Sequence, residues 1–187
     1  MKSEYDIIDN ALSSEQFDDL VDWISSNVFP WYHQDTVAYD DTDDISAFGA
    51  EEKLLRLVPL TESQKVYNFA LMHRVFENEQ MQCSSETWQK VLPILGVLGV
   101  ESLIRIKINY YPRTPKIVHH KNHRDLDFKH KGAIFYLNES DGLTVLEDGT
   151  EIESVPNRLV LFDSSRPHHS TTTTNTNRRL NINFNYM

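Results

Sequence analysis

Apolar and polar residues follow two different periods along this chain, and the change falls near residue 102. Before it, apolar residues recur every three or four positions, the period of amphipathic helices. After it, they alternate with polar residues, as in half-buried β-strands. The pattern predicts a helical support region over 1–101 and a β-rich core over 102–187, packed as one globular unit.

Helix-capping signals refine the prediction for the front region. Serine residues that can cap a helix precede two of the apolar patterns, and Pro30 ends the first pattern. The expected helices begin at Ser13 or Ser14, near Glu62, and at Ser84 or Ser85. The second helix is expected to carry its apolar face through Phe76, and the third to bend at Pro93 or begin close to it. The acidic, irregular stretch 32–48 predicts a loop.

Short strands at close spacing characterise the back region. Ile104, Ile106 and Ile108 share one face of the first strand. Further strand-like runs follow at 132–138, 143–146, 150–155, 158–162 and 179–186. Turn signals lie at 139–142 and 147–149. This spacing favours a β-sandwich or jelly-roll barrel of the α+β class, with the N-terminal helices buttressing one sheet.

Charge is uneven along the chain, which has a formal net charge of −10. The front region is acidic, whereas basic residues gather between 105 and 131. They are Arg105, Lys107, Arg113, Lys116, Lys121, Arg124, Lys129 and Lys131. Such a field favours an anionic small molecule or an acidic substrate, but a solvated face that balances the front region explains it equally well.

The composition excludes several classes of protein. No run of apolar residues is long enough for a membrane helix, and the N-terminal residues lack the apolar core of a secretory signal. Cys83 is the only cysteine, which excludes a disulfide framework and a cysteine-rich zinc site. We therefore expect a cytoplasmic protein without a membrane partner.

Candidate chemistry centres on the triplet His123-Arg124-Asp125. In an extended segment the first and third side chains point to the same side, so one metal ion can bind both. A third ligand must come from another strand, and the pair His168-His169 supplies it. Two imidazoles and one carboxylate leave open positions on the metal, as in non-haem Fe(II) oxygenases.

Several segments of the back region, in this order, resemble the 2-oxoglutarate/Fe(II)-dependent oxygenase superfamily in its prolyl-hydroxylase-like branch. They are INYYP (108–112), HRD (123–125), FYLN (135–138), FDSSRPHHS (162–170) and RRLNINFNY (178–186). Short phage-encoded members are especially similar. The resemblance implies a double-stranded β-helix, the jelly-roll barrel of this superfamily, and an N-terminal region that flanks it.

The resemblance also implies the roles of individual residues. The iron positions fall on His123, Asp125 and His168, with His168 preferred to His169 because the distal histidine of the family commonly follows a proline. The remaining implied residues concern 2-oxoglutarate. They are Arg179 and Tyr136 for its distal carboxylate, Asn181 where the family often has serine, and Tyr111 and Asn109 beside them. His119, His120 and His130 are expected on exposed loops.

The basic residue of the last strand has two candidates. Arg178 is nearer the spacing usual for the branch. Strand parity favours Arg179, because Arg178 shares a side with the apolar residues Leu180 and Ile182, whereas Arg179 shares a side with Asn181. A β-bulge would reverse this assignment.

The implied activity is that of a dioxygenase that uses Fe(II), 2-oxoglutarate and O2, with ascorbate as an optional reductant. It hydroxylates an unidentified substrate and releases succinate and CO2. A prolyl residue of a protein is the first candidate substrate, ahead of a small molecule.

A nucleobase- or nucleotide-oxidising enzyme is less favoured, because the chain is acidic. A non-catalytic cupin-like metal- or ligand-binding module is the alternative of another class, and it would have no need of a carboxylate anchor at Arg179. If the chain is phage-encoded, the compartment would be the host-cell cytoplasm.

Overall fold

A computed structural model describes residues 4–38, 50, 53–54 and 57–187. The helices are α1 (Ser14–Ser25), α3 (Glu62–Tyr67) and α4 (Ser85–Leu98). The strands from the front region are β1 (Tyr5–Ile8), β2 (Tyr32–Gln34), β3 (Ala70–Glu77) and β4 (Gln80–Met81). Those from the back region are β5 (Leu103–Pro112), β6 (Lys131–Tyr136), β7 (Ser140–Leu146), β8 (Glu151–Ser154), β9 (Leu159–Phe162), β10 (His168–Ser170) and β11 (Arg178–Tyr186).

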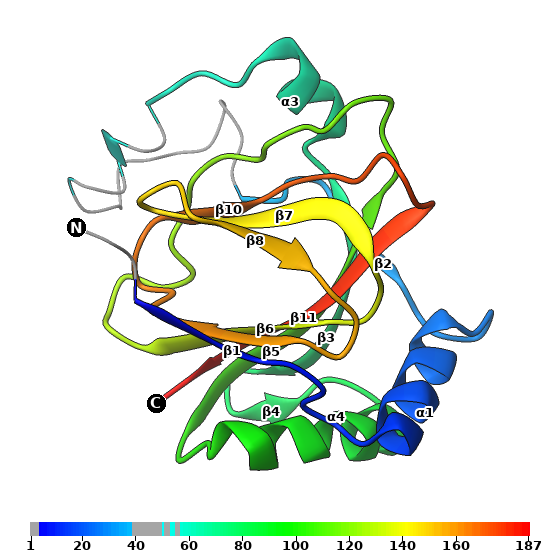
Figure 1. Ribbon diagram of the computed structural model, residues 1–187. Helices are drawn as coiled ribbons and strands as arrows, with labels where there is room; N and C mark the ends of the chain where they lie inside the picture. The colour runs from blue at the N-terminus through cyan, green and yellow to red at the C-terminus, as the bar shows by residue number, and fades with distance from the viewer. Residues whose placement is uncertain (1–3, 39–49, 51–52, 55–56) are drawn as a thin grey trace.

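Two antiparallel sheets lie one above the other (Figure 1). Within the described residues, the large sheet has eight strands in the order β1-β9-β6-β11-β5-β3-β2, with β4 paired to β3. The small sheet has the order β10-β7-β8. Helices α1 and α4 cover the side of the large sheet that points away from the small one (Figure 1). This is the predicted double-stranded β-helix with helices that buttress one sheet.

Alternation along β5 and β11 gives the large sheet two different sides. On the helix side, Ile106, Ile182 and Phe184 are fully buried against helix residues such as Leu20 and Ile94. On the opposite side, which we call the cavity side, polar residues face the small sheet. They are Arg105, Lys107, Asn109 and Tyr111 on β5, and Arg179, Asn181, Asn183 and Asn185 on β11. Apolar packing against the helices therefore holds in place a sheet whose other side is polar.

Local signals fix the ends of the two long helices. Ser13 caps α1 in a capping box with Gln16, and Ser84 caps α4 through the backbone of Thr87. Gly99 ends α4 in the left-handed conformation (φ 59°), and Pro93 is accommodated inside the helix. These helices agree with the prediction. None of the helices in the described part of the chain combines the length and hydrophobicity needed to cross a bilayer.

The predicted helix from Glu62 through Phe76 is wrong beyond its first turns. Thr61 caps the short helix α3, which buries no residue, and residues 70–77 form strand β3 instead. Strand β3 pairs with β5, where His73 lies opposite Ile108. Partners distant in sequence therefore override the local period. The loop predicted over 32–48 begins as strand β2, and its residues 39–48 lie outside the described residues.

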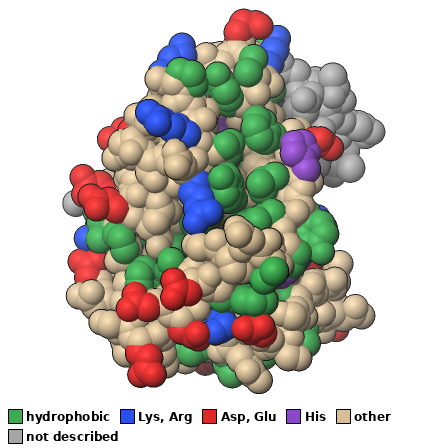
Figure 2. Space-filling model, turned by 90° about the vertical axis from the view of Figure 1, so that its right-hand side faces the viewer, with side chains coloured by type: hydrophobic (Ala, Val, Ile, Leu, Met, Phe, Trp, Pro, Cys, Tyr) green, Lys and Arg blue, Asp and Glu red, His purple; other side chains and the backbone are tan. Residues whose placement is uncertain are grey.

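Strand pairing also corrects the picture of region 1–101 as a helical layer. Strand β1 pairs with β9, whereas β2 and β4 both pair with β3. The four strands that the structure describes in this region belong to the large sheet. Acidic side chains gather over the lower part of the face that lies on the right in Figure 1 (Figure 2).

Asn157 ties helix α1 to the cavity-forming sheets. Its side-chain amide accepts a hydrogen bond from the Leu12 nitrogen and donates one to the Leu12 carbonyl, each 2.9 Å long. Its own backbone nitrogen donates to the carbonyl of Tyr136, the last residue of β6. Asn157 has a positive φ of 59°, a conformation that asparagine tolerates better than most residues. The chain before α1 is thus bonded to the turn between β8 and β9, and through Asn157 to the end of β6.

Asp141 on β7 organises the loop that leads into β11. Its carboxylate accepts hydrogen bonds from the Thr173 hydroxyl (2.7 Å), from the backbone and hydroxyl of Thr174, and from the backbone of Asn175. Burial alone would raise the pKa of Asp141, but these hydrogen bonds outweigh it and lower the pKa from 3.8 to about 2. The threonine run 171–174 is therefore not a solvated loop, because Thr171, Thr172 and Thr173 are buried.

Substitution Asp141→Asn tests this anchor. Because the folded-state pKa is depressed, the carboxylate stabilises the fold above about pH 4, and the contribution is lost as the pH falls toward 2. We expect the variant to lose on the order of 1 kcal/mol of unfolding free energy at pH 7, a value discounted for solvent screening. The difference from the unsubstituted protein should shrink below pH 3. Urea unfolding across this pH range measures it, with the exposed Asp127→Asn as control. A constant difference at all pH values would contradict the assignment.

Candidate metal centre

Backbone pairing brings the two histidine segments together. His123 and His168 form an isolated antiparallel bridge, in which each backbone nitrogen donates to the other residue's carbonyl at 2.9 and 3.0 Å. The Asp125 nitrogen donates to the Ser164 carbonyl at 3.1 Å. Bridged residues of antiparallel chains place their side chains on the same side. The chain from 123 to 125 is thereby fixed against the segment that leads into β10.

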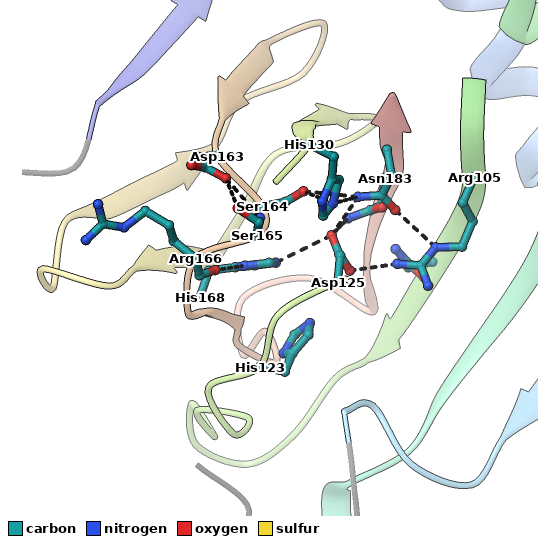
Figure 3. Close-up of polar contacts among 12 residues, drawn as sticks. Arg105, His123, Asp125, His130, Asp163, Ser164, Ser165, Arg166, His168 and Asn183 are labelled. Carbon is teal, nitrogen blue, oxygen red and sulfur yellow. Dashed lines mark hydrogen bonds and ion pairs between the residues drawn. The ribbon is translucent and has the colours of Figure 1, made fainter. Parts of the chain in front are cut away.

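The side chains of His123, Asp125 and His168 converge. Each offers one ligand atom, and these atoms all lie within 4.8 Å of one another. The His168 Nε2 lies 3.7 Å from the Asp125 Oδ2, and the two imidazole rings are 4.7 Å apart between centroids. Figure 3 shows His168 and Asp125 pointing toward each other, with His123 below them. The structure thus brings together the three residues that the sequence nominates as metal ligands.

Carbonyl contacts set the tautomers of both histidines. The Nδ1 of His123 lies 3.2 Å from the Lys121 carbonyl, and the Nδ1 of His168 lies 3.0 Å from the Arg166 carbonyl. Because a carbonyl only accepts, each Nδ1 carries the proton and each Nε2 keeps its lone pair for a metal. Burial, followed by the charge of His168, lowers the pKa of His123 from 6.5 to about 3. His123 is therefore neutral at pH 7, as a metal ligand must be.

Donors on the large sheet hold the Asp125 carboxylate. Arg105 donates to its Oδ1 at 2.8 Å, and Asn183 and Asn185 donate to its Oδ2 at 3.2 and 2.9 Å (Figure 3). Burial alone would raise the pKa of Asp125, but the charges of His168 and Arg105 outweigh it and hold the pKa well below its usual value. The carboxylate is therefore ionised and fixed in orientation, ready to bind a cation.

Residues behind Asp125 form a network that the sequence reading missed. Asn185 also donates to the Ser164 hydroxyl at 3.1 Å, and Ser164 lies 2.8 Å from the Nε2 of His130. The expectation of exposed loops holds for His119, but it is wrong for His120 and His130, which are 3% and 4% exposed. The signal that was available for Asn185 is parity, because it lies on the same side of β11 as Arg179.

Arg179 is fully buried on the cavity side. Its Nε donates to the Ser154 hydroxyl at 2.8 Å, and its Nη2 donates to the Thr144 hydroxyl at 3.0 Å. Its Nη1 donates to the Thr171 carbonyl at 3.4 Å. Within the described residues no carboxylate pairs with this guanidinium. A buried cation without a counter-anion is costly, so the site favours an anionic ligand.

Aromatic residues and Thr144 surround the guanidinium. The Arg179 Cζ lies 5.4 Å from the Tyr111 ring centroid and 5.6 Å from that of Tyr136. The Tyr136 hydroxyl donates to the Thr144 hydroxyl at 2.8 Å. Burial raises the pKa of Tyr136, which keeps this hydroxyl protonated. Arg178 instead lies on the other side of β11, over the Tyr110 ring.

One cavity lies between the metal ligands and the Arg179 environment. Its lining includes Asn109 and Asn181, which are joined by a 3.0 Å hydrogen bond from the Asn109 amide. The other lining residues are Tyr111, His123, Ile134, Thr144, His168, His169, Ser170 and Asn183. His169 lines it as well, but its Nδ1 contacts the Asn122 side chain at 2.6 Å and its Nε2 contacts His119 at 3.1 Å. Its ring nitrogens are thus engaged away from Asp125.

Gly142 makes room for Arg179. The turn predicted at 139–142 is wrong, because strand β7 begins at Ser140 and includes Gly142. A Cβ atom on Gly142 would lie 2.5 Å from the Arg179 Cδ and 2.8 Å from the Thr172 carbonyl oxygen. Only glycine fits there, because the second contact is with backbone.

Solved structures share this architecture. One is a prolyl hydroxylase from Trichoplax adhaerens in complex with a hypoxia inducible factor peptide fragment. The match covers 100% of this chain and 84% of the hydroxylase chain, with a TM-score of 0.60 and 14% sequence identity. Another is the epimerase SnoN from nogalamycin biosynthesis, described as non-heme and alpha-ketoglutarate-dependent. This match covers 99% of this chain and 78% of the SnoN chain, with a TM-score of 0.57 and 12% sequence identity. A third is the viral collagen prolyl hydroxylase vCPH from Paramecium Bursaria Chlorella virus-1, in its 2OG complex. This match covers 97% of this chain and 94% of the vCPH chain, with a TM-score of 0.51 and 12% sequence identity.

At these identities the structural matches establish the fold. No protein-family model matches the chain, and no curated protein matches it in sequence. The expected similarity to phage-encoded members stays a prediction. The three neighbours share the jelly-roll fold with this chain. The site within that fold is defined by the distances and hydrogen bonds of this structure, not by the neighbours.

Substitution Asp125→Ala tests the metal centre directly. Removing the only carboxylate of the group should weaken Mn(II) binding by at least about 100-fold, because an open site then keeps two neutral ligands. Isothermal titration with Mn(II) measures the affinity. Asp127→Ala removes an exposed acid two positions away and should leave the affinity unchanged. Equal losses in both variants would show that the metal binds elsewhere.

Proposed function

We propose that the chain is a non-haem Fe(II)- and 2-oxoglutarate-dependent dioxygenase that hydroxylates its substrate and releases succinate and CO2. The observation that carries the proposal is Arg179, which is fully buried and has no carboxylate partner among the described residues. Its neighbours Tyr111 and Thr144 line a cavity together with His123 and His168. A module that only binds a metal does not require a buried guanidinium, because that group is stabilised only when an anionic ligand binds beside it. The three structural neighbours, each a hydroxylase or an oxoacid-dependent epimerase by its description, support the same reading.

The ligand set fits Fe(II). Two imidazoles and an ionised carboxylate form the facial set that leaves positions open for an oxoacid and O2. A closed structural zinc site would require a fourth protein ligand, and among the described residues the group has three members. Cys83, the only thiol of the chain, is far from the ligands in sequence and packs against the apolar core. His123, Asp125 and His168 would therefore hold the iron.

The Arg179 environment fits the distal carboxylate of 2-oxoglutarate. A guanidinium carries five N–H groups, and those of Arg179 donate to the Ser154 and Thr144 hydroxyls and to the Thr171 carbonyl without saturating it, so N–H donors remain for a ligand. The Tyr136 hydroxyl and Thr144 lie against the same guanidinium, where they would complete a carboxylate cradle. Asn109, Asn181 and Tyr111 line the path from this cradle to the metal ligands and would contact the oxoacid along its length.

These residues would divide the work of catalysis. Iron, when bound, supplies the activation of O2 at the expense of 2-oxoglutarate. Arg179 and Tyr136 hold the co-substrate in one orientation by charge and hydrogen bonding. Arg105 and the asparagines on β11 keep Asp125 ionised and stationary, so that its carboxylate would bind the iron in one fixed orientation. Ascorbate would serve as an optional reductant.

The first candidate substrate remains a prolyl residue of a protein, because two of the neighbours are described as prolyl hydroxylases and one of them holds a peptide. The nucleic-acid alternative depended on the basic stretch 105–131. Within it, Arg105 is paired with Asp125, and Lys121 donates to the carbonyls of Val58 and Pro59. The stretch is therefore not one continuous anion-binding surface, which favours a peptide or small-molecule substrate.

The experiment that tests the proposed function is an anaerobic titration of the Fe(II)-loaded protein with 2-oxoglutarate, followed by measurement of succinate formation in air. Arg179→Gln should weaken 2-oxoglutarate binding by at least about 30-fold, the lower end of the 2–5 kcal/mol expected for truncating a buried charge pair. Arg178→Gln is the matched control and should bind normally, since Arg178 lies on the other side of the strand. Unchanged binding in Arg179→Gln would reject the carboxylate cradle.

Gly142→Ala tests the same cradle without removing a charge. The added methyl group should displace the Arg179 side chain, so 2-oxoglutarate affinity should fall at least about tenfold while Mn(II) affinity is retained. The control is Gly96→Ala, where a Cβ atom meets nothing within 4 Å. That helical substitution should stabilise the fold by about 0.5–1 kcal/mol and leave both affinities unchanged. Thermal unfolding and titration calorimetry on both variants provide the comparison.

A further inference from the structure

Lys107 is a second cation on the cavity side that has no counter-anion among the described residues. It lies on β5 between Arg105, which bonds to Asp125, and Asn109, which lines the cavity. Across the sheet it lies directly opposite Asn183 of β11, which also lines the cavity. Its charge acts on both His123 and Asp125, which places it near the metal centre.

The acids near Lys107 are already engaged. Asp125 bonds to Arg105, and Glu77 pairs with Arg74 at 3.0 Å. Across the described part of the chain, the side-chain ammonium of Lys107 makes no hydrogen bond or ion pair. Burial, and next the charge of Arg105, lower the pKa of Lys107 from 10.5 to about 8, against the opposing effect of Asp125 and Glu77. The side chain is still mainly protonated at pH 7 and is poorly compensated.

Asn183 leaves an unused acceptor at the same place. Its side chain is 8% exposed, and its Nδ2 donates to Asp125. Its Oδ1 is buried and has no hydrogen-bond partner. A buried polar atom without a partner costs free energy comparable to a lost hydrogen bond. Lys107 and Asn183 are directly paired across β5 and β11, so one row on the cavity side carries both an ammonium group and an orphaned carbonyl oxygen, and Asn183 also bonds to the metal ligand Asp125.

We propose that Lys107 and Asn183 form a substrate subsite that binds a carboxylate with an adjacent N–H group, as found in an N-acylated amino acid or at the C-terminal end of a peptide. The inference rests on the proposed oxygenase function. Lys107 pairs with the carboxylate, and the Asn183 Oδ1 accepts the N–H. This subsite lies two rows along the sheet from Arg179, so the primary substrate and 2-oxoglutarate are held by different cations.

Binding of a matched pair of probes tests the subsite. The protein is loaded with Mn(II), which does not support turnover, and with saturating 2-oxoglutarate so that Arg179 is occupied. N-acetylglycine carries the carboxylate and the N–H, whereas N-acetylglycinamide has nearly the same shape without the charge. We expect saturable paramagnetic broadening of the N-acetylglycine proton signals, and at least tenfold weaker binding of the amide. Equal binding of the two probes would overturn the proposal.

Variants assign the binding to Lys107. Lys107→Met and Lys107→Gln should each weaken N-acetylglycine binding at least tenfold, whereas Lys107→Arg should keep it within about threefold. Lys116→Met, at an exposed basic position of the same stretch, should bind normally. Thermal unfolding establishes that each variant is folded, and Lys107→Met should melt no lower than the unsubstituted protein because it removes a poorly compensated charge. Binding that survives in both neutral variants would reject the subsite.

The same samples separate this proposal from the oxygenase proposal. Titration of 2-oxoglutarate into the unsubstituted and Arg179→Gln proteins reports only on the co-substrate cradle. If 2-oxoglutarate fails to bind, the oxygenase proposal falls, and N-acetylglycine titrated into the Mn(II)-loaded protein still reports on Lys107. If probe binding is lost in Arg179→Gln but not in the Lys107 variants, the probe occupies the oxoacid cradle and the subsite is refuted.

Discussion

The structure depends on the strict alternation of side chains along β11. Every second residue, from Leu180 to Tyr186, packs into the apolar core beneath helices α1 and α4. The residues between them, from Arg179 to Asn185, carry the polar groups of the site. A shift of the strand by one residue would bury the asparagines in the core and expose the isoleucine and phenylalanine to the cavity. Packing energy on one side therefore fixes the position of every polar group on the other.

This arrangement separates stability from chemistry. The helix side buries aliphatic and aromatic groups, which is the main source of folding free energy. Among the described residues, the cavity side carries groups that cost free energy in the absence of ligands: a guanidinium without a carboxylate partner at Arg179, an ammonium at Lys107 and an orphaned oxygen on Asn183. Bound anions would relieve those costs, so the same features that weaken the ligand-free fold supply affinity.

Local signals were sufficient for part of this picture. Strand alternation placed Arg179 and Asn181 on one side of β11, and the His-x-Asp triplet identified side chains that do converge with His168. Strand β3 was missed because its partner β5 lies about thirty residues farther along the chain, and a local helical period masked it. The burial of His120 and His130, and the bond from Arg105 to Asp125, were invisible because each depends on contacts between distant segments. The catalytic roles themselves stay predictions.

The bonds of Asn157 reach beyond the turn in which it lies. Its side chain hydrogen-bonds to the backbone of Leu12, and its backbone nitrogen donates to the carbonyl of Tyr136. The start of helix α1 and the tyrosine beside the buried guanidinium are thus attached to one small residue. If helix α1 undocked, the end of β6 would lose these hydrogen bonds. Ligand binding in the oxoacid cradle and docking of the helix are therefore thermodynamically linked. A ligand that stabilises Tyr136 should also slow hydrogen exchange at the amides of residues 11 and 12.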